Sequence, residues 1–594
     1  MELIFLQLVS GLVKAMVLFL VASGLSLVFG VGRVINLAHA SFYMLGAYLF
    51  YTVMEHIPNR TLGYWLALPL VPVAVALVAG LVERSILRRA YRGGVLSVVM
   101  VTFGLILLIE GTTRIIWTDK QLLVSTPAFL RGYLSLASFP LSLYYLPIVI
   151  VAPLTALGMW YLFYRTRWGM VVRAATMDRE MLGALGINVP RLFTITFILA
   201  AWLAGLGGVL AAPTSALLPT MDSAIIIEAF AVVVIGGLGS IAGSFIAALL
   251  IGELLAFGLL VFPALSLVLV FLVMAVVLVI RPWGLMGRPL PDQPEATERA
   301  THPVFGRAAP RWLVYLGLVA LVVVLAALPK FLSYYNILIA TSILILALFT
   351  LSFNLLLGYA GMVSFGHAAY FAIGAYGAGL LYKKLDVPML LAFAAAPVIA
   401  AIGAMVFGYF RVRRSHAYFI MLTLAFAQIL YAVTFKWYSL TGGDNGLVGI
   451  SPIPALLSPQ AFYYFTLAVV GVCLVLMFRV VNSPFGSALK AIRENPLRAE
   501  AVGIAVWKYR WIAFVIAGFF AGIAGALSAF YQRGAHPEFA FWTKSAEPMV
   551  AAILGSVHNF FGPVLGAAIF IMVQRMVSRV TEPWSVVVGA LNII

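Results

Sequence analysis

Asn36-Leu-Ala-His39-Ala-Ser-Phe-Tyr-Met-Leu-Gly46-Ala-Tyr48 occurs a second time in this chain as Ser364-Phe-Gly-His367-Ala-Ala-Tyr-Phe-Ala-Ile-Gly374-Ala-Tyr376. Two further blocks repeat in the same order and at a similar spacing. One pairs Gly186-Ile187 with Gly503-Ile504, and the other pairs the residues around Gly236 with those around Gly555. Three blocks in one order indicate two tandem copies of a single unit. In a membrane protein, such parallel repeats are expected to surround a central path.

The composition predicts an all-α polytopic membrane protein. Hydrophobic residues make up 64% of the chain and charged residues 10%, whereas a soluble domain carries about 25% charged residues. Many apolar runs reach the roughly 20 residues that a membrane-spanning helix needs. The first run has no clear cleavage site, so we interpret it as the first span and not as a signal peptide. With a single cysteine, Cys473, the chain has no disulfide framework or cysteine-ligated metal site, and we expect no cofactor.

The positive charge is distributed as a topology signal. The chain has 37 Lys and Arg residues against 20 Asp and Glu residues, which by itself would suit a nucleic-acid partner. Most of these basic residues, however, lie in short loops beside hydrophobic runs. Such loops face the cytoplasm under the positive-inside rule, so we expect no nucleic acid. The basic loops are 84–92, 165–191, 281–311, 411–414 and 479–510.

When these loops are placed in the cytoplasm, the spans between them must alternate in direction. The resulting topology predicts a first domain over residues 1–282, a cytoplasmic linker over 283–310 and a second domain over 311–594. The N-terminus is then extracytoplasmic. The run 312–330 supplies one extra linking helix, which lets both copies start outside. The run 224–259 must enter the bilayer and return to the same side, so we predict a re-entrant hairpin there and a second one over 546–578. The last run, from 584, has about half the length of a span.

Two of the cytoplasmic loops, 165–191 and 482–504, are longer than the topology requires. Each contains a basic amphipathic stretch, an alanine-rich helical turn and a glycine that can close the helix in a left-handed conformation. Solvated basic loops would have a similar composition. Because the pattern occurs twice, we predict a pair of docking surfaces for another protein. The candidate residues are Arg173, Glu180, Ala184, Gly186, Lys490, Glu494, Ala501 and Gly503.

A second set of residues is a candidate for the translocation path or its gate, with a purely structural role as the alternative. Asn36 and Ser364 are residue types that cap helices, and we expect the histidine three positions after each to bond into the local turn. The glycines at the two hairpin turns complete the set. The candidates are Asn36, His39, Ser364, His367, Gly236 and Gly555.

Four acidic residues lie in or beside the apolar runs. Glu228 and Glu547 occur at matching places, and we predict that they cap the N-termini of the two hairpins, where the helix dipole favours a carboxylate. Glu110 and Glu253 lie within predicted spans but near their ends, from where a long side chain can alternatively reach the interface. An ionisable residue there is a functional candidate by default.

The two long loops resemble the coupling loops of ABC importer permeases, in which a short helix fits a groove of the ATPase. The whole chain resembles the branched-chain amino acid (Liv-type) permease family, with its two permease subunits fused. Residues 24–48 and Arg281-Pro-Trp-Gly284-Leu285 look like the first subunit. Residues 351–367 and Thr441-Gly-Gly-Asp444-Asn-Gly446 look like the second. The second half departs from the pattern because it lacks the closing Arg-Pro-x-Gly-Leu type of ending.

This resemblance implies the transmembrane permease of an ABC importer in the plasma membrane, here the bacterial inner membrane. It implies branched-chain amino acids or related small polar organic solutes as cargo. The implied partners are two cytoplasmic ABC ATPase subunits, which would drive alternating access, and an extracytoplasmic substrate-binding protein. The chain has no Gly-x-x-x-x-Gly-Lys-[Ser/Thr] phosphate loop, so we expect that it is not itself an enzyme.

The alternative is an ion-coupled secondary transporter or channel built from parallel repeats. That class usually needs ionisable groups near the middle of the membrane, and this chain has few.

The predicted topology can be tested by labelling at Ala300. A cysteine placed there, in a Cys473→Ala background, is expected to resist an impermeant thiol reagent added to intact cells, because the linker is cytoplasmic. It should react once the cells are opened. Ready labelling of the intact cells would contradict the parallel arrangement.

Overall fold

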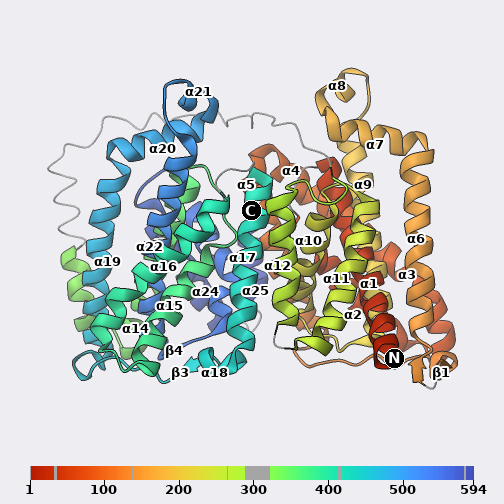
Figure 1. The fold of residues 1–594 in the computed structure, drawn as a ribbon, viewed down its shortest axis with the longest axis horizontal. Helices are drawn as coiled ribbons and strands as arrows, with labels where there is room; N and C mark the ends of the chain where they lie inside the picture. The colour runs from red at the N-terminus through yellow and green to blue at the C-terminus, as the bar shows by residue number, and fades with distance from the viewer. Residues whose placement is uncertain are drawn as a thin grey trace. The chain divides into compact units, whose positions relative to one another are not determined.

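The computed structural model describes residues 2–32, 36–136, 139–263, 265–287, 322–411, 416–580 and 584–593. They belong to two compact units (Figure 1). Unit 1 comprises Met1–Asp292 with Met576–Ile594, and unit 2 comprises Gln293–Arg575. In the described part of the chain, 11 helices are long and apolar enough to cross a membrane. The predicted all-α, polytopic fold class is confirmed.

Unit 1 is a helix bundle with one short antiparallel hairpin of strands, β1 (Tyr133–Leu136) and β2 (Phe139–Ser142). Its helices are α1 (Glu2–Gly32), α2 (His39–His56), α3 (Arg60–Val82), α4 (Arg88–Ala90), α5 (Gly94–Trp117), α6 (Tyr145–Arg165), α7 (Arg167–Met177), α8 (Arg179–Ala184), α9 (Val189–Ala211), α10 (Met221–Gly236), α11 (Ile241–Val261), α12 (Ser266–Ile280) and α25 (Trp584–Ile593).

Unit 2 repeats this plan, with β3 (Leu447–Val448) paired antiparallel to β4 (Gly534–Ala535). Its helices are α14 (Tyr334–Asn354), α15 (His367–Lys384), α16 (Met389–Arg411), α17 (His416–Lys436), α18 (Tyr438–Thr441), α19 (Pro459–Val481), α20 (Pro484–Glu494), α21 (Pro496–Ala501), α22 (Val506–Gln532), α23 (Trp542–Gly555) and most of α24 (Gly562–Val580). The predicted linker and the first part of the crossing 312–330 lie outside the described residues. An apolar helix covers Val322–Phe331.

The glycines that repeat in the sequence are the places where helices of one unit approach most closely. A Cβ atom on Gly208 of α9 would overlap the carbonyl oxygen of Tyr43 in α2. In unit 2, a Cβ atom on Gly525 of α22 would overlap the carbonyl oxygen of Phe371 in α15. The two backbones therefore touch directly at each crossing, as is common where small residues line the contact between membrane helices.

The helices α2 and α15 begin beside the interior of the preceding helix and not beside its end. The Nε2 atom of His39, the first residue of α2, lies 3.0 Å from the carbonyl oxygen of Val21. Val21 precedes the end of α1 at Gly32 by about 11 residues, or about 16 Å. In unit 2, the Nε2 atom of His367 lies 2.9 Å from the hydroxyl oxygen of Ser352 in α14. Each unit therefore holds a helix N-terminus, with its positive partial charge, inside the bundle.

Helical hairpins lie at both predicted positions, α10–α11 and α23–α24, while their return to the same side of the bilayer stays a prediction. The turn between α10 and α11 lies beside the segment that follows α12. Leu285 N–H donates to the carbonyl of Ile235 at 2.8 Å, and Met286 N–H donates to that of Gly236 at 3.0 Å. The last carbonyls of a helix need such donors, which explains why this segment covers the turn.

The glycines Gly236 and Gly555 close these hairpins. A Cβ atom on Gly236 would overlap the backbone of Gly243, and one on Gly555 would overlap the backbone of Gly562. The structure thus gives both glycines a packing role, and their place on a translocation path stays a prediction.

The last helix, α25, packs on α5 within unit 1. A Cβ atom on Gly104 would lie 2.8 Å from the carbonyl oxygen of Gly589, and one on Gly589 would lie 2.6 Å from that of Gly104. This short helix is therefore fixed by a close backbone contact.

The crossing at Gly525 can be tested with one methyl group. Gly525→Ala is expected to destabilise the protein by about 1–3 kcal/mol, because α15 and α22 must separate to accommodate the added carbon. Gly471→Ala, on α19, is the matched control, since no atom lies within 4 Å of its added Cβ. The midpoint of thermal unfolding, followed by tryptophan fluorescence in detergent, should fall only for Gly525→Ala. Equal midpoints would contradict the close crossing.

Candidate functional site

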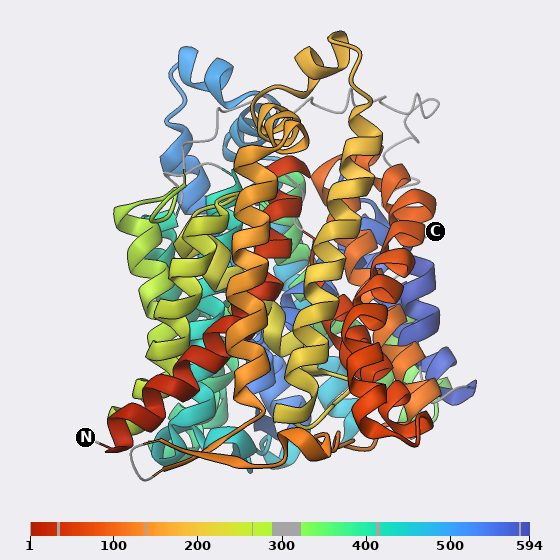
Figure 2. The same ribbon diagram turned by 90° about the vertical axis from the view of Figure 1, so that its right-hand side faces the viewer.

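The two long loops fold into the same pair of short helices, α7–α8 in unit 1 and α20–α21 in unit 2. Each of the four helices starts with a side chain that accepts a hydrogen bond from a backbone N–H in the first turn, which satisfies a donor that the helix leaves free. The donor–acceptor distances are 3.0–3.4 Å, and the capping residues are Thr166, Asp178, Ser483 and Asn495. In Figures 1 and 2, α8 projects beyond the ends of α6 and α9.

The predicted left-handed glycines are confirmed. Gly186 has φ +81° and Gly503 has φ +87°. At each end, the residue after the glycine and the glycine itself donate backbone hydrogen bonds back into the short helix, for example from Ile187 to Leu182 at 3.1 Å and from Ile504 to Ala499 at 3.0 Å. This pattern is the Schellman motif. Nothing lies within 4 Å of a Cβ built on either glycine, so the space beside them is open.

An apolar side chain precedes each of these glycines and is exposed. Leu185 is 71% exposed, and its counterpart Val502 is 76% exposed. The alanines before them, Ala184 and Ala501, are exposed as well. Buried residues on the opposite side, including Leu182 and Ala499, hold each short helix in place. The two helix pairs therefore present the same small apolar tip on a firm base, and such exposed patches are typical of contact surfaces.

The basic candidates do not project in the same way. The guanidinium of Arg173 donates to the carbonyl of Phe163 and lies 5.3 Å from the ring centre of Tyr164. The ammonium group of Lys490 lies 5.5 Å from the ring centre of Tyr359. Both groups contact their own unit. The carboxylates Glu180 and Glu494 are exposed, and the described residues include no ion pair for either.

Arg493, which the sequence analysis did not select, connects α20 to the core of unit 2. Its guanidinium donates to the carbonyl of Gly358, in the turn that ends α14. One turn earlier, the side chain of Asn354 donates to the carbonyl of Val557 at 3.2 Å, in the turn of the α23–α24 hairpin. This arginine has no basic counterpart in the first copy, where Thr176 occupies the matching position, so a search for repeats passes over it.

The two histidine junctions differ from their predicted geometry. The N-cap residues are Ala38 and Gly366, and not Asn36 and Ser364. Asn36 and Ser364 instead accept a hydrogen bond from the backbone N–H two residues later, at 3.1 and 3.4 Å. Short polar side chains commonly form such turns.

The expectation that His39 and His367 bond into their local turns is wrong, because each bonds to the preceding long helix. Both histidines are buried, and the ring of His367 stacks on Phe349 with the ring centres 5.3 Å apart. The histidines therefore join two helices at the buried N-terminus of the second one.

The predicted capping role of Glu228 and Glu547 is also wrong. The helices α10 and α23 begin several residues earlier than predicted, so both glutamates lie in helix interiors. Each forms an ion pair instead: Glu228 with Lys14 at 2.8 Å, and Glu547 with Lys544 at 2.6 Å.

Two bundles of apolar helices, each with a projecting helix pair, are the architecture of a multi-pass membrane protein. A family model described as "Branched-chain amino acid transport system / permease component" matches residues 7–278 and again residues 335–594. The chain belongs to this family and contains its domain twice, which confirms the tandem repeats and the predicted fusion.

Individual relatives each cover about half of the chain. The permease protein BraD of Pseudomonas aeruginosa is 31% identical over 296 residues, which are 48% of this chain and 95% of BraD. The permease protein LivM of Escherichia coli is 26% identical over 307 residues, or 47% of this chain and 72% of LivM. LivH of Methanocaldococcus jannaschii is 28% identical over 298 residues, or 47% of this chain and 90% of LivH. BraD and LivM are named as parts of high-affinity branched-chain amino acid transport systems.

The link between Arg493 and Gly358 is testable by hydrogen exchange. Arg493→Gln removes a charge-assisted hydrogen bond, which contributes about 1–2 kcal/mol, so backbone amides in residues 484–494 should exchange about tenfold faster. Arg498→Gln, an exposed arginine on α21, is the control and should change nothing in that helix. Unchanged exchange in Arg493→Gln would show that α20 is held by its apolar face alone.

Proposed function

We propose that this chain is the membrane-spanning part of an ATP-driven ABC importer, and that α7–α8 and α20–α21 each dock one cytoplasmic ATPase subunit. The observation that carries the proposal is the matched construction of the two pairs. Both have capped helices, a left-handed glycine at the tip and an exposed apolar residue just before it. A loop needed only for topology has no reason to keep this construction in both copies.

The tips suit a groove in a partner protein. An apolar side chain of moderate size beside open space can insert into a pocket, and a central apolar anchor of this kind commonly dominates the energy of an interface. In this arrangement Leu185 and Val502 are the anchors. Ala184, Ala501 and the two glycines permit close approach, and Glu180 and Glu494 lie at the rim, where charges affect orientation more than affinity.

Movement of the docked ATPases would reach the bundle through the base of each helix pair. In unit 2 the route is Arg493 to Gly358, and from Asn354 to the α23–α24 hairpin. In unit 1 a different arginine connects the helix pair to the bundle: the guanidinium of Arg173 donates a hydrogen bond to the carbonyl of Phe163 in the last turn of α6. Binding and hydrolysis of ATP would thereby shift the bundle between outward and inward access, with the histidine junctions and hairpin turns as the candidate gate.

The named relatives support branched-chain amino acids or related small polar solutes as the cargo. A substrate-binding protein would deliver the solute on the outer side, where the N-terminus lies in the predicted topology. The protein would act in the bacterial inner membrane.

Substitution of Gly186 and Gly503, the glycines at the tips of the helix pairs, tests the proposed docking of the ATPase. Gly503→Val is expected to reduce uptake and recovery of the ATPase together, since a branched side chain in a left-handed conformation costs about 1–2 kcal/mol and also obstructs the docking surface. The chain should remain inserted and folded, because the glycine is exposed. Gly186→Val should act in the same direction. Uptake of labelled leucine by cells and co-purification of the ATPase with the tagged chain are the measurements.

Gly471→Val is the matched control, because this glycine also has open space for a side chain but lies on α19, away from the tips. Normal uptake and full ATPase recovery in both tip variants would mean that the helix pairs are topological features, and the proposed coupling would be wrong.

A further inference from the structure

One face of α2 meets one face of α5 in unit 1. Residues Ser41, Tyr48 and Thr52 fall on a common face of α2, and Glu110, Arg114 and Trp117 fall on a common face of α5, because residues three, four, seven or eleven positions apart in a helix lie on one side. Trp117 donates from its indole nitrogen to the hydroxyl of Thr52 at 2.8 Å, and the rings of Trp117 and Tyr48 lie 5.3 Å apart. These contacts bring the two faces together near the outer ends of both helices in the predicted topology.

The inner end of this contact holds a buried carboxylate. Asp222, in the first turn of α10, is 2% exposed. Its Oδ2 accepts a hydrogen bond from the hydroxyl of Ser41 at 2.6 Å, and its Oδ1 accepts one from the backbone N–H of Ser223 at 2.7 Å. Ser41 is in the first turn of α2, so the carboxylate lies where two helix N-termini meet inside the bundle.

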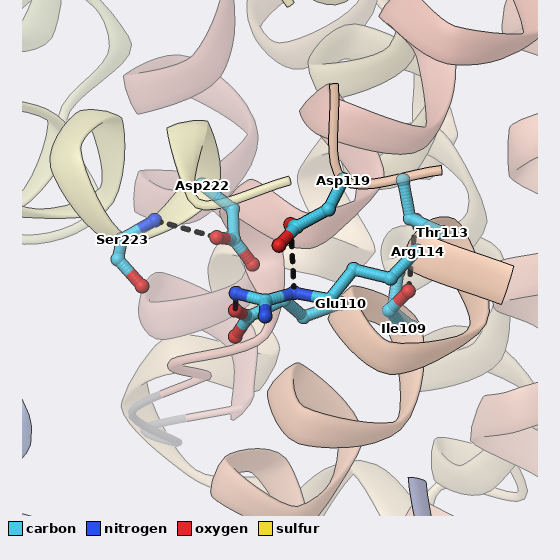
Figure 3. Close-up of polar contacts among 7 residues, drawn as sticks. All are labelled: Ile109, Glu110, Thr113, Arg114, Asp119, Asp222 and Ser223. Carbon is cyan, nitrogen blue, oxygen red and sulfur yellow. Dashed lines mark hydrogen bonds and ion pairs between the residues drawn. The ribbon is translucent and has the colours of Figure 1, made fainter. Parts of the chain in front are cut away.

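The charges around Asp222 do not balance. The guanidinium of Arg114 pairs with Glu110 at 2.7 Å and with Asp119 at 3.6 Å. Figure 3 shows Glu110 and Asp119 joined to this guanidinium, and the carboxylate of Asp222 beside the group, bonded to the backbone N–H of Ser223. Among the residues that the structure describes, no ion pair joins Asp222 to a cation. Glu110 and Asp119 thus share a single positive group, Asp119 with 72% of its side chain exposed, while the buried Asp222 has no cation of its own among the described residues. An ionisable residue inside a membrane bundle generally serves a pathway or a ligand.

Tyr48 gives a second, independent indication of a missing polar partner. Its side chain is 0% exposed, and its hydroxyl has no hydrogen-bond partner among the described residues. The hydroxyl lies near enough to Asp119, Arg114 and Asp222 to interact with their charges. Buried hydroxyls are nearly always paired in folded proteins, so this group is suited to a ligand that enters beside it.

Unit 2 shows that the fold does not need these charges. Trp117 corresponds to Trp437 in α17, and with that register Arg114 falls on Thr434 and Glu110 on Leu430. Ser41 corresponds to Ala369, and the position of Asp222 is taken by Phe541. The tyrosine is kept as Tyr376, whose hydroxyl likewise has no hydrogen-bond partner among the described residues. The tyrosine position is thus common to both copies, whereas the carboxylates are specific to unit 1.

We propose that Ser41, Tyr48, Glu110, Arg114, Asp119 and Asp222 form an amine-recognition strip in the translocation path, with Asp222 as the counter-ion for the ammonium group of an amino acid or another small primary amine. The inference rests on the proposed transport function and specifies its substrate class. A primary ammonium can donate three hydrogen bonds. The carboxylate of Asp222 and the hydroxyl of Tyr48 can accept hydrogen bonds from it. Arg114 is already engaged by two carboxylates, so the strip favours a cationic group over an anionic one.

Charge-selective labelling tests the strip without any assumption about the transported solute. The probe is the full chain in membranes with Ser41→Cys and Cys473→Ala, treated with methanethiosulfonate reagents that carry a trimethylammonium or a sulfonate group. The cationic reagent should react at least tenfold faster at position 41 than the anionic one, after correction for their rates with a free thiol. Adding Asp222→Asn should bring the two rates to within about twofold.

Glu253→Gln is the control, because Glu253 is a membrane carboxylate on α11, outside the strip, and it should leave the preference unchanged. A preference that survives Asp222→Asn would overturn the proposal. The absence of labelling by both reagents, with the chain at rest or during ATP hydrolysis by its complex, would also overturn it, since the strip would then lie off any aqueous path.

Uptake of labelled leucine separates this inference from the proposed function. Asp222→Asn should lower uptake at least tenfold while the ATPase is still recovered with the chain, whereas Ser41→Ala, which keeps the charge, should lower it less than threefold. Equal losses in both variants would indicate a structural role and contradict the proposal. Uptake is measured in sodium and in choline buffers, because a defect confined to sodium would assign Asp222 to a metal cation and overturn the amine assignment.

If the wild-type chain transports no leucine, that solute assignment in the proposed function fails, while the labelling ratio still decides the strip.

Discussion

Direct backbone contact at the repeated glycines is the constraint on which each bundle depends. Where Gly208 meets Tyr43 and Gly525 meets Phe371, no side chain separates the crossing helices. These contacts fix α2 against α9 and α15 against α22. They thereby hold the N-termini of α2 and α15 inside the bundles, where His39 and His367 bond to the preceding helices. Without close crossings, a helix that begins about 16 Å from the end of its neighbour would have its first N–H groups exposed to lipid, which is costly.

The two copies share the structure of their helix pairs and differ at the start of their hairpins. Both retain the helix pairs with their capped starts and left-handed glycines, as expected if each unit needs the same kind of partner. They differ at the buried start of the hairpin. In unit 1, Ser41 holds the carboxylate of Asp222, whereas in unit 2 the hydroxyl of Ser545 accepts from the backbone N–H of Ala368 at 2.9 Å. The junction of unit 1 therefore contains a buried carboxylate that the junction of unit 2 lacks.

Features that depend on residues close together in the chain could be predicted from the sequence. The spans, both hairpins and the left-handed Gly186 and Gly503 follow from apolar run length and local glycine patterns. The histidine bonds could not be predicted, because the depth at which α2 starts depends on packing against α1. The hydrogen bond between Ser41 and Asp222 joins residues 181 positions apart, and no local pattern indicates it. The capping prediction for Glu228 failed because α10 begins earlier than its apolar run.

The proposed function requires one chain to provide two docking sites for ATPase subunits. Native mass spectrometry of the complex, purified from its own cells through a tag on this chain, measures that directly. We expect a particle with one copy of the chain and two ATPase subunits, reduced to one ATPase subunit when either tip carries valine in place of its glycine. A particle with a single ATPase subunit or none, obtained from the unmodified chain under conditions that preserve transport, would contradict it.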